Sequence, residues 1–473
     1  MRVIHFAAEC YPVAKVGGLA DVLGALPKYQ RKAGITASVV MPFYNKAFVQ
    51  NNELEIVYEG QIQQGHSLYD YHVLKERSDL LGFELILIKI PGLLDREEIY
   101  SYPDESEQFL AFQHAALNWL CDTNLRPDII HCHDHHTGLI PFYIENAKQF
   151  AYLKGVPTVA TVHNGQYQGW QNWDSAALMP AFDTWRWGLL DWNGLINPLA
   201  ALIKCCWAYT TVSEGYLHEL YTRANGLESL FKAEQDKSYG IVNGIDTDVW
   251  NTLTDPMLNH NFSQAAVKKG KEISKKNIGE QYGMDETLPL FVFIGRFALE
   301  KGADLLVSVF ESIFENLKGQ ANFFVLGSGD KNIEASLLKI QKQFSQHLAL
   351  FIGYNEELAH QVYASADFLL MPSRIEPCGL NQLYAMRYGT VPVVHATGGL
   401  KDTVIDMNEG GYGILFNDIT VSGIAEAIQR ALQHWNATDQ KQWTTLRKKL
   451  MKLDFSWEKS TRKYTELYNK LIN

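Results

Sequence analysis

The chain of 473 residues lacks several features that mark particular classes of protein. It has only six cysteines, with no CxxC pair and no regular spacing, so we expect no disulfide framework and a reduced compartment. No apolar run reaches the roughly 18 residues of a membrane span. The opening segment, Met1 to Glu9, is too short and ends wrongly for a secretory signal. We therefore predict a cytoplasmic protein with no membrane partner.

An excess of positive charge is also missing. The formal net charge is -11, whereas a protein that binds a phosphate backbone normally carries a basic domain or stripe. Nucleic acid is therefore not an expected partner, although a neutral polymer would be indifferent to this charge. Hydrophobic residues make up 47% of the chain, which is ordinary for a globular protein, and the length allows two or three domains.

Short apolar runs alternate with amphipathic stretches in both halves of the chain, which predicts parallel sheets with helices on both faces. The expected strands of the first half are 3–8, 39–41, 85–90, 128–131 and 158–162, with a helix over 19–33. Those of the second half are 289–294, 322–326, 350–352, 368–371 and 391–394, with a helix over 302–314. The fold class is therefore α/β, with two doubly wound units in tandem.

Three further stretches organise the chain. Residues 251–286 are polar and rich in lysine, and we interpret them as a solvated linker helix. A hinge is expected near 242–248, and residues 457–471 read as an amphipathic helix. Ligands of open parallel sheets bind beyond the carboxyl ends of the strands, so functional motifs should follow predicted strands.

The first such motif is Lys15-Val16-Gly17-Gly18-Leu19-Ala20-Asp21, which follows the first strand and opens a helix. Paired glycines let a backbone approach a ligand, a helix N-terminus favours an anion, and Lys15 adds a positive charge. A simple tight turn is the alternative. The motif is not the dinucleotide fingerprint GxGxxG, which disfavours a Rossmann dehydrogenase.

The second half has three motifs at strand ends. Arg296 follows a strand and Lys301 starts a helix, so the pair could hold a diphosphate, although a surface pair is the alternative. Glu376 lies in 372–382 after an apolar strand, where its carboxylate could bind a sugar hydroxyl or stabilise positive charge at an anomeric carbon. Thr397-Gly398-Gly399 is a second candidate anion-binding helix start, and Tyr354 ends a strand where it could stack on a base.

Two motifs of the first half contain histidine. The segment 131–138 reads His-Cys-His-Asp-His-His-Thr-Gly, which invites a zinc interpretation. Its spacing is wrong for a structural finger and HExxH is absent, so we expect no metal. His163 and Asn164 follow a predicted strand, where sugar contact and a structural hydrogen-bonding role are both open.

Taken together, these motifs resemble bacterial glycogen synthases and plant starch synthases over nearly the whole chain. The resemblance is carried by residues 15–22, 133–138, 161–164, 242–250, 295–302, 371–383 and 397–404. It implies a GT-B fold, with two Rossmann-like domains facing a deep cleft. The expected domains are residues 1–245, joined by the C-terminal helix 457–473, on the acceptor side, and residues 246–456 on the nucleotide-sugar side.

The resemblance also implies the reaction, a transfer of glucose from ADP-glucose or UDP-glucose to an α-1,4-glucan such as glycogen, with retention. The expected catalytic residues are Glu376, Arg296, Lys301, His163 and Asp21. The expected substrate-binding residues are Lys15, Gly17, Gly18, Asp134, Asn164, Asn243, Tyr354, Cys378, Gly379, Leu380, Thr397, Gly398 and Gly399. Lys15, Arg296 and Lys301 would contact the diphosphate, and no cofactor or metal is expected.

The chain departs from the family pattern at Ala200, Leu202, Glu214, Gly215 and His395. Related retaining transferases often carry a second glutamate where this chain has Tyr384, a change that is normal in synthases. Three alternatives stay open: a transferase of the same fold with another donor or acceptor, a glucan phosphorylase, and a non-catalytic glucan-binding homologue. No segment matches the pyridoxal-phosphate lysine that a phosphorylase needs.

Overall fold

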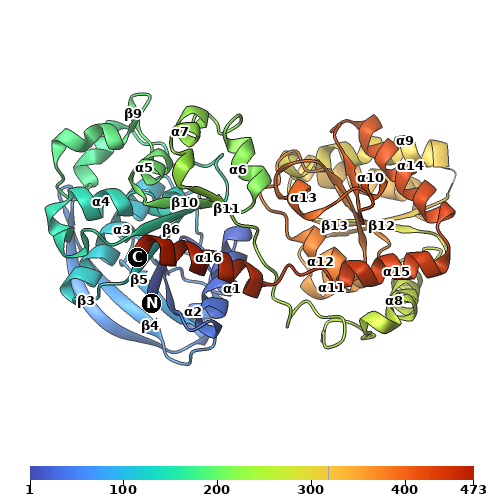
Figure 1. Ribbon diagram of the computed structural model, residues 1–473, viewed down its shortest axis with the longest axis horizontal. Helices are drawn as coiled ribbons and strands as arrows, with labels where there is room; N and C mark the ends of the chain where they lie inside the picture. The colour runs from blue at the N-terminus through green and yellow to red at the C-terminus, as the bar shows by residue number, and fades with distance from the viewer. Residues whose placement is uncertain (318) are drawn as a thin grey trace. The chain divides into compact units, whose positions relative to one another are not determined.

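The computed structural model describes residues 1–317 and 319–473, and these form two compact units (Figure 1). Unit 1 comprises Met1–Gly244 and Trp457–Asn473, and unit 2 comprises Ile245–Ser456. The last helix, red in Figure 1, therefore belongs to the unit that contains the N-terminus. No helix among the described residues is long and apolar enough to cross a membrane.

Unit 1 is built on one mixed sheet with the strand order β11-β10-β7-β6-β1-β2-β5-β4-β3. The strands are β1 (Arg2–Phe6), β2 (Thr36–Pro42), β3 (Leu54–Gln64), β4 (Ser67–Glu76), β5 (Glu84–Lys89), β6 (Ile129–His133), β7 (Thr158–Val162), β10 (Ala208–Thr211) and β11 (Ser238–Gly240). The pairings from β11 to β5 are parallel, whereas β3 and β4 form an antiparallel hairpin at one edge. The alternation of short apolar runs did not predict this hairpin.

Helices cover the sheet of unit 1. They are α1 (Gly18–Lys32), α2 (Ala47–Asn51), α3 (Glu105–Asp122), α4 (Ile140–Asn146), α5 (Pro198–Cys205), α6 (Glu214–Leu220), α7 (Glu228–Ala233) and α16 (Trp457–Ile472). One core cluster joins Val3 and Val39 of the strands to Leu23 of α1 and Tyr464 of α16. The C-terminal helix is thus an integral part of the core of unit 1, because packing against this core buries the apolar face of the helix away from water.

Unit 2 has a parallel sheet with the order β14-β13-β12-β15-β16-β17. Its strands are β12 (Leu290–Ile294), β13 (Asn322–Gly327), β14 (Leu348–Ile352), β15 (Phe368–Met371), β16 (Val391–His395) and β17 (Ile414–Phe416). Its helices are α8 (Val267–Tyr282), α9 (Leu306–Leu317), α10 (Lys331–Gln343), α11 (Glu356–Ser365), α12 (Asn381–Arg387), α13 (Gly398–Thr403), α14 (Val421–Ala437) and α15 (Gln440–Met451).

Both faces of the second sheet are covered, which is why its strands are mostly apolar. On β12, Phe291 and Phe293 belong to one core cluster, while Leu290 and Val292 belong to the other. The first cluster includes residues of α9 and α14, and the second includes residues of α8 and α11. The carboxyl ends of the strands are therefore the free positions for polar chemistry.

The prediction of a solvated linker over 251–286 was wrong for its helical part. Lys271 of α8 is 2% exposed, and its Nζ donates to the carbonyl oxygens of Tyr363 and Tyr388 and to Thr390 Oγ1. Lys275 Nζ lies 2.6 Å from Asp367 Oδ2. Lysines with long apolar stems can enter an interior when every ammonium hydrogen finds an acceptor, so the lysine-rich composition hid a helix packed on unit 2.

Candidate active site

Glu376 carries a buried carboxylate in the loop after β15. The residue is 6% exposed. Ser373 Oγ donates to its Oε2 at 2.9 Å, and Lys301 Nζ lies 2.8 Å from Oε1 and 2.7 Å from Oε2. A buried carboxylate is stable only when it is paired and hydrogen-bonded. These partners therefore hold the carboxyl group of Glu376 at a fixed position at the carboxyl edge of the sheet.

A glycine lets the Lys301 segment reach this loop. Gly302 has φ +68°, and a Cβ atom there would lie 1.9 Å from the carbonyl oxygen of Pro372. The neighbouring Arg374 N–H donates to the Glu300 carbonyl at 2.8 Å, and its guanidinium is bidentate to Asp304. The two segments thus meet backbone to backbone, which fixes the distance between the lysine and the carboxylate.

The pair Gly398-Gly399 supports the same loop from the other side. A Cβ on Gly398 would lie 2.2 Å from the carbonyl oxygen of Glu376, and one on Gly399 would lie 2.3 Å from that of Cys378. The Gly399 N–H donates to the Glu376 carbonyl at 3.1 Å. This N–H is therefore engaged by a protein carbonyl, and the substrate-binding role of Gly399 stays a prediction. Both glycines allow the close approach of two loops.

Arg296 follows β12 and its side chain is 57% exposed. Its guanidinium forms an ion pair with Glu300, four residues on, and is available for exchange onto a ligand because it is largely solvated. Tyr354 follows β14, is 75% exposed, and donates to Glu356 Oε2 at 3.1 Å. Both side chains lie at carboxyl strand ends of the same sheet, as the sequence predicted.

The other predicted residues of this loop contact neighbouring protein groups. Cys378 is buried, and Gly379 has φ +71°. Gln382 Nε2 donates to the carbonyl oxygens of both. Leu380 is half-buried at the start of α12, and Thr397, 3% exposed, precedes α13. Together these contacts immobilise the backbone on either side of Glu376.

Lys15 and Asp21 form an ion pair in unit 1, with Nζ 2.6 Å from Oδ1. The backbone N–H groups of Val16 and Gly17 donate to Glu9 Oε2 at 2.5 and 2.9 Å. Glu9, 4% exposed, therefore fills the anion position expected at these two groups. Sequence reasoning missed Glu9, because nothing in the local pattern marks it. Positions 17 and 18 have open space beside them.

His163 and Asp134 are joined at the ends of β7 and β6. The His163 N–H donates to Asp134 Oδ1 at 2.7 Å. Burial raises the pKa of Asp134 to about 7, opposed by the backbone N–H groups of His163 and Asn164. Asp134 has φ 58° and ψ -176°, a region that is nearly exclusive to glycine and costs about 1–3 kcal/mol. Such strain is typical of functional loops.

Two predicted amides differ in their surroundings. Asn164 Oδ1 accepts from the Gln166 N–H at 3.0 Å. Asn243 is 5% exposed, and its Oδ1 has no hydrogen-bond partner among the described residues. An unpaired buried amide oxygen costs free energy, so Asn243 is the predicted residue whose own geometry most clearly calls for a ligand.

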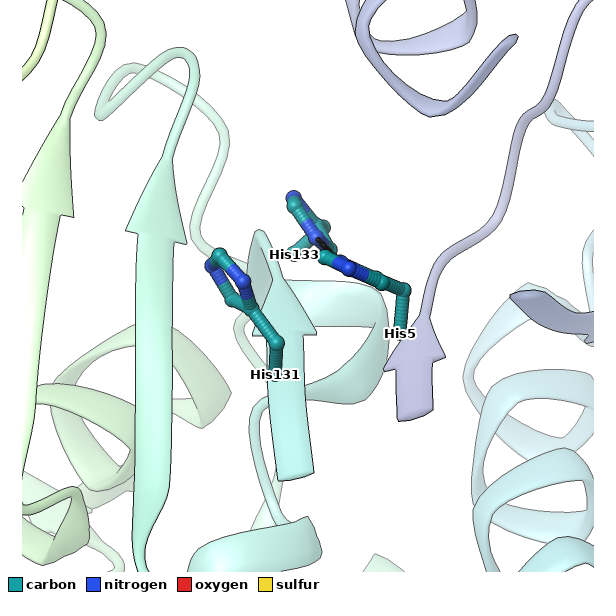
Figure 2. A group of neighbouring side chains, drawn as sticks. All are labelled: His5, His131 and His133. Atoms are coloured by element: carbon teal, nitrogen blue, oxygen red, sulfur yellow. Dashed lines mark hydrogen bonds between the residues drawn. The ribbon is translucent and has the colours of Figure 1, made fainter. Parts of the chain in front are cut away.

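Three histidines cluster beneath the strand ends of unit 1, where Figure 2 shows His5, His131 and His133 with their rings close together. A metal would need free ring nitrogens. His5 bonds Gln30 and His133, His131 bonds Tyr468 and Thr161, and His133 bonds His5 and His163. All six ring nitrogens are thus engaged by protein groups, and this arrangement favours a hydrogen-bond network over a metal centre.

The departures from the family pattern differ in burial: Glu214 is exposed, and Gly215 and His395 are half-buried. Ala200 and Leu202 are fully buried in α5. Tyr384 stacks on Trp250, with ring centroids 3.7 Å apart, which explains why an aromatic residue stands there. His395 ends β16, and its Nδ1 is 2.7 Å from the carbonyl oxygen of Ser373. The imidazole therefore supports the Glu376 loop from a third side.

Comparisons with known proteins agree with this geometry. A family model described as the starch synthase catalytic domain matches residues 2–233, and one described as glycosyl transferases group 1 matches residues 274–448. The chain is 48% identical to a glycogen synthase of Flavobacterium johnsoniae, covering 100% of this chain and 99% of the relative. It is 34% identical to a glycogen synthase of Streptococcus sanguinis, covering 100% of both.

The fold is likewise shared with solved structures. The catalytic domain of starch synthase IV from Arabidopsis thaliana, bound to ADP and acarbose, superposes with a TM-score of 0.89 at 31% identity over 99% of both chains. Sucrose-phosphate synthase from Thermosynechococcus elongatus superposes with a TM-score of 0.64 at 18% identity, which bears on the fold alone. Two Rossmann-like units with the GT-B architecture, and full-length identity to glycogen synthases, place the chain in the glycogen and starch synthase family of retaining glycosyltransferases.

Proposed function

We propose that the chain transfers glucose from ADP-glucose to the non-reducing end of an α-1,4-glucan, with the residues of the Glu376 loop acting on the donor. The observation that carries the proposal is the buried group of Lys301, Glu376 and Ser373 at a carboxyl strand edge. The choice of ADP-glucose is supported by the related starch synthase, whose structure holds ADP. UDP-glucose is the alternative donor.

The transfer proceeds in this proposal without a protein nucleophile. The bond between the anomeric carbon and the diphosphate oxygen breaks, and the acceptor 4-hydroxyl oxygen forms the new α(1→4) bond on the same face. The leaving phosphate oxygen takes the proton of that hydroxyl. Arg296 and Lys301 stabilise the negative charge that develops on the diphosphate, and Glu376 stabilises the positive charge on the sugar ring.

Each proposed cation is paired with a carboxylate of its own unit: Lys15 with Asp21, Arg296 with Glu300, and Lys301 with Glu376. A diphosphate would compete for Lys15 and Arg296, whose exposed ion pairs contribute only about 0–1 kcal/mol each, whereas Lys301 is also held by the buried carboxylate of Glu376. In the same proposal, Lys15 contacts the diphosphate, while Asp21, His163 and Asn164 line the sugar side. The base lies against Tyr354.

The proposal includes no cofactor and no metal, since cationic side chains supply the charge that a metal would otherwise provide. It also places the enzyme in the cytoplasm. All six cysteines are free, which fits a reducing compartment.

The decisive experiment measures glucose transfer to glycogen from ADP-glucose and from UDP-glucose side by side, following release of the nucleoside diphosphate. Faster turnover with ADP-glucose is the expected result, and turnover should persist in a chelator. Release with UDP-glucose alone would reverse the donor assignment. Glycogen binding without release from either donor would favour the non-catalytic alternative.

A further inference from the structure

A continuous chain of buried hydrogen bonds links the C-terminal helix of unit 1 to His163. It begins at the Ala160 carbonyl and ends at the imidazole of His163. Its members, in order, are Ala160, Thr210, Thr161, His131, Tyr468, Gln30, His5, His133 and His163. Each link is 3.3 Å or shorter. We call this set the histidine chain.

The strand register explains why these residues meet. His5 of β1 is paired with His131 of β6, His133 with Thr161 of β7, and Thr161 with Thr210 of β10. Side chains paired across adjacent parallel strands lie on one face of the sheet. Gln30 near the end of α1 and Tyr468 of α16 close the chain over that face.

The first half of the histidine chain has one possible direction. A carbonyl oxygen only accepts, so the single hydroxyl hydrogen of Thr210 goes to Ala160 O at 3.3 Å. Thr161 must then donate to Thr210 and accept from His131 Nε2. A neutral imidazole has one N–H, so His131 Nδ1 is an acceptor, and the hydrogen of that bond comes from the Tyr468 hydroxyl at 2.7 Å.

The second half inherits this direction. With its hydrogen given to His131, the Tyr468 oxygen accepts from Gln30 Nε2 at 3.2 Å, which leaves Gln30 Oε1 to accept from His5 Nε2 at 2.7 Å. The His5 Nδ1 atom is then bare and accepts from His133 Nε2 at 3.0 Å. By the same rule, His133 Nδ1 accepts from His163 Nε2 at 2.9 Å.

The argument that each imidazole carries a single N–H requires neutral rings, and burial keeps these histidines neutral. Desolvation lowers the pKa of His5 to about 4 and that of His163 to about 3. Burial also holds the pKa values of His131 and His133 well below the ordinary value, with neighbouring histidines adding to the effect. At neutral pH each ring therefore carries one hydrogen.

We propose that the histidine chain locks His163 in the Nε2–H tautomer, so that its Nδ1 accepts a hydrogen bond from a sugar hydroxyl during glucose transfer. Nδ1 of His163 is the one ring nitrogen of the four histidines for which the described residues provide no partner. Tyr468 and Gln30 are then positioning residues, which act through His5 and His133 without touching substrate.

A fixed tautomer of His163 does more than fill space in the core. If the imidazole exchanged tautomers, Nδ1 would carry a hydrogen for part of the time and could not then accept a hydrogen bond from a sugar hydroxyl. Fixing the direction removes that exchange and preorganises the contact before the sugar arrives. Fixation of a ring by the hydrogen bond at its other nitrogen is the general way in which proteins choose a histidine tautomer.

The tautomer is measured directly, without activity. Protein with ¹⁵N-labelled histidine, compared with the His163→Gln variant, identifies the two ring nitrogens of His163 in long-range ¹H–¹⁵N spectra. We expect a protonated Nε2 and a bare Nδ1 at pH 7. A protonated Nδ1 on His163 of the unmodified protein would overturn the proposal.

Kinetics test the consequence, which rests on the proposed function. Tyr468→Phe removes one oxygen and breaks the histidine chain at its centre. Its kcat should fall about 3- to 10-fold, the worth of one neutral hydrogen bond, and its spectrum should show Nδ1–H in part of the molecules. In a His163→Ala background the same change should cost nothing further. An equal loss in both backgrounds would reduce Tyr468 to a structural role.

A matched control is Tyr143→Phe, which deletes another buried hydroxyl of unit 1, one with no partner among the described residues. It should leave both kcat and the spectrum of His163 unchanged. Normal turnover of His163→Ala itself would remove His163 from the proposed sugar site and with it the acceptor role of Nδ1. The spectrum distinguishes that outcome from a histidine chain with the opposite hydrogen-bond direction, in which Nδ1 of His163 would be protonated.

Discussion

Lys301 Nζ lies almost equally far from the two carboxylate oxygens of Glu376, at 2.8 and 2.7 Å. The carboxylate is buried while the lysine side chain is 25% exposed, so the ammonium has one side towards the protein and one towards solvent. The Lys301 ammonium can thus bind the Glu376 carboxylate and remain accessible to a diphosphate on its exposed side. Glu376 and its lysine are best regarded as one unit.

Replacing Lys301 by methionine is expected to lower kcat by about 10²- to 10³-fold, the usual effect of losing one preorganised charge donor. The Glu376 carboxylate would stay buried with Ser373 as its remaining side-chain partner, so the melting temperature should also fall. Steady-state kinetics and calorimetry measure the two effects. The control is Lys331→Met, whose ion pair with Glu334 lies on an 85% exposed lysine and should matter little. Unchanged turnover of Lys301→Met would remove this lysine from the mechanism.

Replacing Arg296 by alanine should lower turnover by a similar factor of about 10²–10³ while leaving stability nearly unchanged. The guanidinium is mostly solvated, so the fold depends little on it. Arg296→Lys keeps the charge but loses the planar guanidinium that can bind two phosphate oxygens. Its turnover should therefore lie between that of the wild-type protein and that of Arg296→Ala. Turnover of both variants at saturating donor, with a melting curve of each, provides the measurement. Wild-type turnover in Arg296→Ala would contradict the assignment.

Replacing Gly302 by alanine should destabilise unit 2 and displace Lys301. The new Cβ would meet the Pro372 carbonyl at 1.9 Å, and the left-handed φ of +68° adds about 1–2 kcal/mol. Gly410→Ala is the matched control, with a φ of +76° and open space around its Cβ position. The control should cost only the backbone term and keep its activity. Equal unfolding free energies for the two variants would show that the close approach is unimportant.

The stability of unit 1 should fall as the pH drops from 7 to 5. Burial lowers the pKa values of His5, His114 and His135 to about 4 and that of His163 to about 3, from an ordinary 6.5. Below pH 6.5 the unfolded chain therefore binds protons that the folded chain refuses. Each such histidine costs about 1.4 kcal/mol of unfolding free energy per pH unit in that window.

Asp134 opposes this trend, since a pKa raised from 3.8 to about 7 makes folding favour the protonated acid as the pH falls. Burial also lowers the pKa values of His131, His133 and His136, so one carboxyl stands against seven histidines and the net slope stays positive with pH. Hydrogen exchange of peptides covering β1 and β6, at increasing urea and at pH 7, 6 and 5, measures it. His114→Phe should reduce the slope by about one proton. An unfolding midpoint that does not move between pH 7 and 5 would refute the prediction.

The sequence alone placed most of the candidate site residues at strand ends. Arg296, Tyr354, Glu376 and His163 follow β12, β14, β15 and β7, because runs of apolar residues announce buried strands whatever the rest of the chain does. The same periodicity predicted two doubly wound units. It failed for the β3–β4 hairpin and for α8, whose polar composition conceals one buried face.

Only the tertiary structure decided which residues meet. Lys301 and Glu376 are 75 residues apart, and Gln30 and Tyr468 are 438 apart. Local patterns carry no information about such partners, because register and strand order choose them. The bonds of Glu9 with the Val16 and Gly17 N–H groups, and of the Gly399 N–H with the Glu376 carbonyl, could not be foreseen for the same reason. The residue types thus determined which chemistry is possible. The burial of the side chains and the direction of their hydrogen bonds determine the protonation state of each histidine.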